Sequence, residues 1–159
     1  MSKRSPVYIF IAALSAAVLI AGVFMFLQPR GELVLRDADS GAEYARFRVG
    51  RSAEFSVTFI HSVSNSPYTD YYEISREGIF LIGARYYEFG AGVPSNLELG
   101  ESIEYLEDGS LRISGMRTPV TDLIYILGKD SDHILGLRGQ KYSLKELCGE
   151  KKTVELVYE

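Results

Sequence analysis

An uncharged run of 21 residues, from Val7 to Leu27, lies near the N-terminus of this chain and shows no polar face. At 1.5 Å per residue, a helix of this length is about 30 Å long, which matches the hydrocarbon core of a bilayer. A cleavable signal peptide has a shorter apolar region followed by small residues, whereas Gln28-Pro29-Arg30 follows here. The sequence therefore predicts an uncleaved transmembrane anchor, surrounded by membrane lipid.

The charges that flank this run predict its orientation. Lys3 and Arg4 precede the run, whereas Arg30 follows it with Glu32 close behind. The positive-inside rule keeps the N-terminus in the cytoplasm and sends the rest of the chain across the cell membrane. The predicted organisation is a cytoplasmic tail at residues 1–6, a single-pass anchor at 7–27, a linker at 28–31 and an extracytoplasmic domain at 32–159.

The composition of the exported part restricts its partners and its cross-links. Two of the 17 Lys and Arg residues precede the linker, so residues 28–159 hold 15 of them against 21 Asp and Glu, a formal charge of −6. Such a surface repels polyphosphates, so we expect no nucleic acid partner. Cys148 is the single cysteine, which leaves no internal disulfide and favours a buried, small apolar side chain.

Residues 32–159 show the period-two alternation of half-buried strands. Phe55, Val57 and Phe59, for example, alternate with more polar residues. This pattern, with frequent turn signals, predicts an all-β domain, a small antiparallel sandwich or partly open barrel, preceded by one N-terminal transmembrane helix. The predicted strands are 32–36, 43–49, 54–61, 68–75, 79–87, 103–106, 111–114, 123–127, 133–137 and 153–158, with a turn of helix at 143–148.

Two turn sequences predict hairpins. Glu107-Asp108-Gly109 contains the Asp-Gly pair typical of tight turns, and it joins the strands predicted at 103–106 and 111–114. A second polar cluster joins the strands predicted at 123–127 and 133–137. In both places a short polar turn between two apolar strands is the basis of the prediction.

The densest group of polar side chains lies where the strand at 54–61 ends. His61 could titrate near neutral pH, bind a metal or donate a hydrogen bond. Ser62 is the nearest candidate nucleophile, but adjacent strand residues point to opposite faces, so His61 is poorly placed to activate it. Pro67 interrupts the chain before the next strand, and Asp70 is the nearest candidate acid. A hydrolase that uses His61 is therefore the weakest alternative, and no catalytic residue is assigned.

A glycine-rich segment, Phe89 to Asn96, is the second candidate. Gly90 and Gly92 flank Ala91 and can adopt positive φ, and Pro94 stiffens the exit. A phosphate cradle would need a following helix, and no amphipathic helix follows. We expect a tight irregular turn that packs against the His61 loop, or alternatively a contact with a ligand or partner.

The sequence predicts no metal site and no cofactor. The chain has two histidines, His61 and His133, and one cysteine, and none of them form the closely spaced pairs typical of zinc sites. The acidic turns Asp37–Asp39 and Asp130–Asp132 lack the spacing of a calcium loop, so we interpret them as solvated turns.

Together the two candidate segments resemble a known family. The pattern Phe-Ile-His-Ser-Val, then Pro67, Asp70 and Tyr72, and later Phe-Gly-Ala-Gly-Val-Pro, is similar to the bacterial and archaeal family called domain of unknown function 1850. The similarity covers most of residues 31–159. Ser64 stands where the family often has Glu, and Val93 stands where Leu is commoner.

This resemblance implies a role beside a transporter. Members are typically encoded next to TAXI-type TRAP transporters, which take up organic acids with an extracytoplasmic binding protein. We therefore expect a membrane-anchored accessory or interaction domain that contacts the transporter permease or its binding protein. The alternative is a small-ligand-binding domain for an organic anion, with Arg85 or Arg117 as the counter-charge. The expected functional surface is His61, Ser62, Pro67, Asp70, Gly90, Ala91, Gly92 and Pro94.

Overall fold

The computed structural model describes residues 14–19, 30–50, 52–62, 64–87, 99–129 and 131–159. The chain divides into two compact units, residues 1–30 and 31–159. In the first unit, residues 14–19 are helical. Among the described residues, no helix is both long and apolar enough to cross a membrane. Most of the predicted anchor at 7–27 lies outside these residues.

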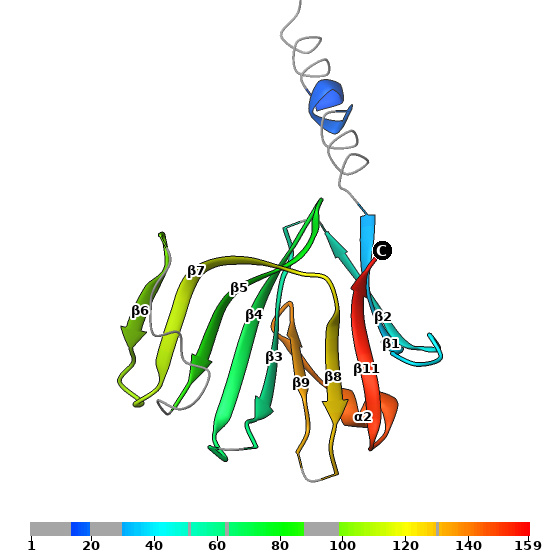
Figure 1. The fold of residues 1–159 in the computed structure, drawn as a ribbon. Helices are drawn as coiled ribbons and strands as arrows, with labels where there is room; N and C mark the ends of the chain where they lie inside the picture. Colours follow the sequence, from blue (N-terminus) through cyan, green and yellow to red (C-terminus); the bar gives the residue numbers. More distant parts are fainter. Residues whose placement is uncertain (1–13, 20–29, 51, 63, 88–98, 130) are drawn as a thin grey trace, which may run out of the picture. The chain divides into compact units, whose positions relative to one another are not determined.

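The second unit consists of two antiparallel sheets (Figure 1). The four-stranded sheet has the order β2-β1-β11-β8, and the seven-stranded sheet has the order β10-β9-β3-β4-β5-β7-β6. The strands of the first sheet are β1 (Arg30–Asp37), β2 (Glu43–Gly50), β8 (Leu123–Leu127) and β11 (Lys152–Tyr158). Those of the second are β3 (Glu54–Ile60), β4 (Pro67–Ser75), β5 (Gly78–Tyr86), β6 (Ser102–Tyr105), β7 (Leu111–Val120), β9 (Ile134–Leu137) and β10 (Gln140–Ser143), and helix α2 (Leu144–Cys148) follows β10.

The larger of two apolar clusters lies between the two sheets. Alternate side chains of the central strands point inward, and each one that is fully buried contributes about 1.5–3 kcal/mol to folding. The core draws on both sheets, which makes the domain a sandwich and confirms the predicted all-β antiparallel class. Its fully or almost fully buried members include Leu33, Leu35, Leu127, Val154 and Leu156 from the four-stranded sheet, and Phe55, Val57, Ile74 and Leu135 from the seven-stranded sheet.

The middle of β5 contains a register shift that sets the position of its second half. Tyr71 of β4 pairs with Gly83, but the next residue, Tyr72, pairs with Leu81, so Ile82 is an extra residue. Gly83 also lies against β7, where a Cβ atom would be 2.5 Å from the carbonyl oxygen of Ile113. The bulge therefore depends on a residue without a side chain.

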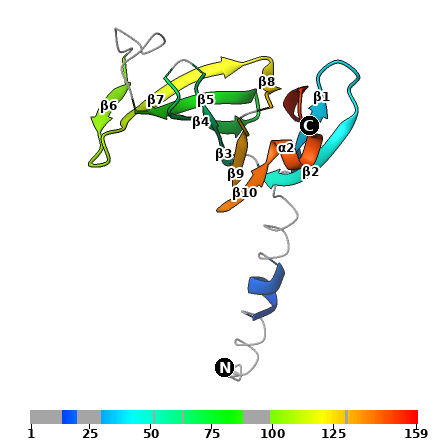
Figure 2. The same ribbon diagram turned by 90° about the horizontal axis from the view of Figure 1, so that it is seen from below.

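The sequence predicted most of the strands, and one predicted pairing is wrong. The hairpin between β6 and β7 is confirmed. The hairpin expected between 123–127 and 133–137 does not form, because β8 pairs with β11 and β9 pairs with β3 and β10. β8 and β9 belong to different sheets, and their apolar faces meet across the core. Figure 2 shows β8 apart from β9.

Further differences concern β7, β10 and the start of α2. Strand β7 continues to Val120, beyond the predicted end at residue 114, and carries the chain from one sheet toward the other (Figure 1). Strand β10 was not predicted. Helix α2 starts after Ser143, whose Oγ accepts a hydrogen bond from the Glu146 backbone N–H at 2.9 Å. Cys148 is buried, as expected, and burial raises the pKa of its thiol to about 11.

Candidate functional site

The β3–β4 hairpin places His61 directly after the end of β3. The His61 N–H donates to the Ser66 carbonyl at 2.9 Å, and the Asn65 N–H donates to the His61 carbonyl at 2.8 Å. Asn65 has a φ of 49°, a left-handed conformation that asparagine tolerates better than most residues. These bonds close a tight loop, so His61 is held at the end of the sheet by its backbone.

The hydroxyl near the His61 ring belongs to Ser64. Its Oγ lies 3.5 Å from His61 Nδ1 and 2.8 Å from Ser66 Oγ. Ser62, the nucleophile considered from the sequence, is exposed on the loop. Because the Ser64 contact is long and Ser64 is also bonded to Ser66, this arrangement lacks the tight hydroxyl–imidazole pair that nucleophilic catalysis uses.

Asp70 points between the two sheets, on the same face of β4 as apolar and aromatic residues. It is paired with Val57 of β3 on one side and Ala84 of β5 on the other, so its neighbours in the sheet are apolar. Its carboxylate accepts a hydrogen bond of 3.3 Å from Tyr72 Oη. Burial raises the pKa of Asp70 from 3.8 to about 6, although the Tyr72 bond acts in the opposite direction.

A buried bond between two tyrosines joins the sheets beside Asp70. Tyr72 Oη of β4 and Tyr125 Oη of β8 are 2.8 Å apart. Burial raises the pKa of both phenols, and the Asp70 carboxylate raises them further. Both tyrosines are therefore neutral hydrogen-bond donors, and Asp70 is at the end of a short chain of polar groups that crosses the core.

Aromatic rings surround this chain of polar groups. Phe59 stacks on Tyr68 with ring centroids 5.4 Å apart and on His133 at 5.1 Å, and Tyr68 stacks on Tyr86 at 5.4 Å. His133 is 7% exposed, and burial lowers its pKa. Within the described part of the chain, neither His133 Nδ1 nor Tyr86 Oη has a hydrogen-bond partner. We define the Asp70 cluster as Tyr68, Asp70, Tyr72, Tyr125 and His133.

The structure places four of the eight residues expected at the functional surface. His61 and Asp70 are both next to Tyr68, whose ring centroid is 6.1 Å from that of His61 and whose pKa is raised by burial and by Asp70 to about 12. Ser62 and Pro67 are exposed in the same hairpin. Gly90, Ala91, Gly92 and Pro94 lie outside the described residues, so their proximity to His61 stays a prediction.

Tyr125 and His133 were missed from the sequence, although a signal was present. Each alternates with buried leucines, Tyr125 in β8 and His133 just before β9, which places a polar tip inside the sandwich. The same alternation in β4 places Asp70 on the inner face. An ionisable side chain in phase with the apolar positions of a strand is the pattern that would have found the cluster.

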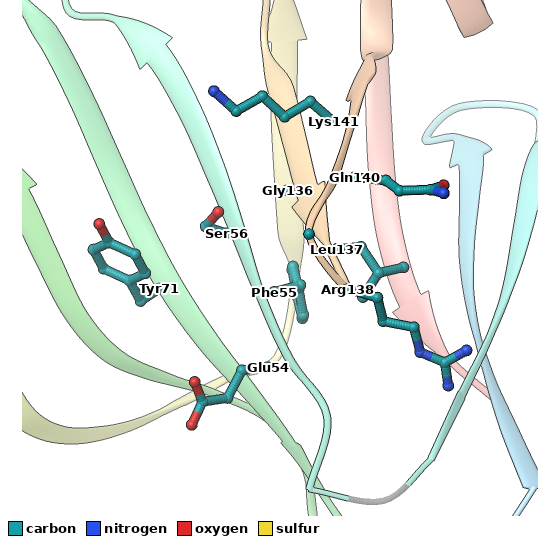
Figure 3. Close-up of a pocket in the computed structure, with 10 residues that line it drawn as sticks. Glu54, Phe55, Ser56, Tyr71, Gly136, Leu137, Arg138, Gln140 and Lys141 are labelled. Carbon is teal, nitrogen blue, oxygen red and sulfur yellow. The ribbon is translucent and has the colours of Figure 1, made fainter.

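A second feature is a shallow groove on the outer face of the seven-stranded sheet, with a volume of about 290 Å³ (Figure 3). Ser56 lies at its centre, between Tyr71 and the β9–β10 hairpin, and Lys141 extends over one end in this view. Arg112 lies over the Tyr71 ring, 5.5 Å from its centroid. The lining residues are Glu54, Phe55, Ser56, Tyr71, Gly136, Leu137, Arg138, Gly139, Gln140 and Lys141.

The two features differ in chemistry. In the Asp70 cluster, a carboxyl with a pKa near 6 can exchange a proton near neutral pH, and a neutral imidazole offers an unused ring nitrogen. The groove offers cationic and hydroxyl groups to solvent. Among the described residues, no group of three or more His, Cys, Asp or Glu could hold a metal ion.

Comparison with known families matches residues 55–144 to the family described as "Domain of unknown function (DUF1850)". No curated protein and no solved structure matches the chain. The matched segment begins in β3 and ends at the start of α2, and it includes every residue of the Asp70 cluster and most of the groove.

Proposed function

This chain belongs to the DUF1850 family, and from that membership we propose that it is a membrane-anchored, extracytoplasmic accessory domain of a TAXI-type TRAP transporter for organic acids. The uncharged run at 7–27 would anchor it in the membrane. The domain at 31–159 would then bind the transporter permease or its binding protein. The link to a transporter is inferred from the family resemblance, and the candidate contact surface is inferred from the residues of the sandwich.

The placement of Asp70 is the observation that carries this proposal. An ionised carboxyl between two sheets opposes folding unless it is paired, and among the described residues Asp70 accepts one hydrogen bond, of 3.3 Å. Apolar residues would pack better at this position. Carboxyls kept at such a cost, beside other polar groups without partners, are typical of functional sites. His61 and Tyr68 lie at the same end of the sheet, where a partner can reach them.

Replacement of Asp70 by Asn or of His61 by Ala is expected to weaken capture of the transporter about tenfold, which corresponds to about 1.4 kcal/mol of binding. Asn keeps the size of the side chain and removes its charge, and Ala removes the imidazole. The measurement is co-purification of the tagged full chain with permease and binding protein from detergent-solubilised membranes.

Asp39→Asn is the matched control, because Asp39 is an exposed carboxylate in the β1–β2 turn and its replacement removes the same charge. Control and wild type should capture the same amount of transporter. Equal capture by all four proteins, or recovery of the full chain in the soluble fraction with its first residues intact, would contradict the proposal.

The groove favours a second candidate function, the binding of a small organic anion. Lys141 and Arg112 bring positive charge to this face although the exported part is acidic overall, and Ser56 adds a hydroxyl. Glu54 at the other end would select against anions that carry charge along their whole length. The site fits a short carboxylate whose acid group binds near Lys141.

Butyrate, a short anion with a single carboxylate, is the probe for this second function. At a hundredfold excess over its Kd it should stabilise the full chain by about 2.7 kcal/mol. Lys141→Gln should raise the Kd about tenfold, whereas Arg76→Gln, which removes an exposed cation from the β4–β5 turn, should leave it unchanged. Thermal denaturation in detergent with increasing butyrate measures both. If the anion stabilised both variants equally, it would bind elsewhere on the protein or at no defined site.

A further inference from the structure

Four strands lie at the edges of the two sheets, and one of them lacks the usual protection. Edge strands present unpaired backbone groups, and proteins commonly place charged residues there to prevent association. Strands β2, β6 and β10 each contain at least one charged residue, as in Arg46, Glu104 and Lys141. Strand β8, with the sequence Leu-Ile-Tyr-Ile-Leu, contains none.

The solvent face of β8 is apolar as well. Leu123, Tyr125 and Leu127 point into the core, whereas Ile126 is 75% exposed and Ile124 is 47% exposed. Two exposed isoleucines at alternate positions of one strand form a continuous apolar strip. Single exposed apolar residues are ordinary on protein surfaces, but a strip along an unprotected edge is not.

The backbone of β8 is paired on one side. Its residues pair with β11, from Lys152 opposite Leu127 to Leu156 opposite Leu123. Within the described part of the chain, β8 ends the four-stranded sheet, and no other strand is bonded to its second edge. Figure 1 shows β8 at this border, and Figure 2 shows that β9 belongs to the other layer.

We propose that β8 is a self-association edge, through which two copies of this chain join their four-stranded sheets into one continuous sheet. The strand reads the same in both directions, so an antiparallel pair centred on Tyr125 places like residues opposite each other. Leu123 then faces Leu127 of the second copy, and Ile124 faces Ile126 of the second copy. Apolar cross-strand pairs of this kind stabilise sheets, and no like charges meet.

Charges just outside the strand support the same register. Asp122 precedes β8 and Lys129 follows it by two residues, and both are exposed. In the pair centred on Tyr125, Asp122 of each copy lies opposite Gly128 of the other, and Lys129 is the next residue along that chain. Within the described residues neither forms an ion pair, so both are available for this contact. A second copy therefore fits the edge by sequence symmetry, hydropathy and charge.

The first test is sedimentation velocity of the full chain in detergent micelles at about 100 µM, where a contact with micromolar Kd is largely saturated. We expect a dimer for the wild type and a monomer for Ile126→Lys, which adds the type of edge charge that β8 lacks. Leu147→Lys, at an apolar position of α2 that is 38% exposed, should stay dimeric. A monomeric wild type, or a dimer in Ile126→Lys, would overturn the proposal.

The second test examines the register and does not depend on stability. In a Cys148→Ala background, Ile124→Cys and Ile126→Cys proteins with different tags are mixed and oxidised. The mixture should form a disulfide-linked heterodimer at least about tenfold more than either protein forms homodimer, since only opposite positions lie within reach. Lys141→Cys on the edge strand β10 is the control and should not be linked. Equal disulfide yields for the heterodimer, the two homodimers and the β10 control would mean that β8 does not direct the association.

Discussion

Replacement of Asp70 by Asn is expected to stabilise the folded protein at pH 8 by up to about 3 kcal/mol and to leave its stability unchanged near pH 4. The carboxyl is half-buried between apolar neighbours, and burial raises its pKa from 3.8 to about 6. Above pH 6 the wild type must keep a charge in the core, whereas Asn is neutral at every pH. Asn can still accept the bond from Tyr72 through its own carbonyl oxygen.

The sign of this effect follows from proton linkage. Because the folded state holds the Asp70 proton more tightly than the unfolded state, the contribution of this group is favourable below pH 3.8. That contribution is lost as the pH rises through the interval from 3.8 to about 6. The difference in stability between the variant and the wild type should therefore grow across this interval and stay constant above it.

Urea denaturation of the full chain in detergent, at a series of pH values from 4 to 8, measures this difference. The chain has 11 tyrosines and no tryptophan, so near-ultraviolet circular dichroism of the tyrosines follows the core. Asp39→Asn serves again as the exposed control and should follow the wild type at every pH. A variant that is less stable than the wild type at pH 8 would show that the Asp70 carboxylate supports the fold.

The outcome also bears on the proposed function. If Asn at position 70 both stabilises the domain and weakens transporter capture, then the native carboxylate is kept at the expense of stability. This trade-off is typical of functional sites, and a purely structural residue would not show it. Loss of capture in a destabilised variant would instead point to general damage of the sandwich.

Local alternation was sufficient to predict the β class and most of the strands. In β3, the apolar residues Phe55 and Val57 point inward and Ser56 points outward, as their period of two requires. The β6–β7 hairpin was predictable for the same reason, because the Asp108-Gly109 turn fixes two neighbouring strands. These features depend on residues that are close in sequence.

The pairing of β8 depends on residues far apart in sequence, and here the prediction was wrong. Alternation shows that Leu123 and Leu135 are both inward-facing, but it does not show whether their strands lie side by side or across the core. β8 lies beside the closing strand β11, in which Val154 is opposite Tyr125, and therefore not beside β9. Strand pairing at long sequence separation leaves no local signal, and the same is true of the register shift at Ile82.

The candidate site was partly accessible from the sequence. His61 and Asp70 were identified from their polar segment, whereas Tyr125 was not, because its contact with Tyr72 joins two sheets. The unpaired ring nitrogen of His133 depends on burial and on the positions of several aromatic rings. Such properties arise from packing in three dimensions, so they require the fold.

Replacement of Gly83 by Ala is expected to destabilise the protein by about 2–3 kcal/mol, as inserted atoms do in a well-packed interior. A Cβ atom at this position would lie 2.5 Å from the backbone carbonyl oxygen of Ile113, a separation that real Cβ atoms essentially never show. The obstacle is backbone in a paired strand and cannot rotate away as a side chain would. Strand β5 or β7 must therefore move.

Gly50→Ala is the matched control, because among the described residues no heavy atom other than those of its chain neighbours would lie within 4 Å of a Cβ atom there, and the residue does not need a positive φ. That substitution should change the stability by no more than about 0.5 kcal/mol, or raise it slightly through the unfolded state.

Because Ala84 pairs with Asp70, displacement of β5 should also alter the surroundings of the carboxyl. In Gly83→Ala, the pH dependence assigned to Asp70 should therefore weaken together with the stability. Equal stability of the two alanine variants would show that β5 and β7 can separate at the bulge without cost, and the bulge would then not fix the position of Ala84 beside Asp70.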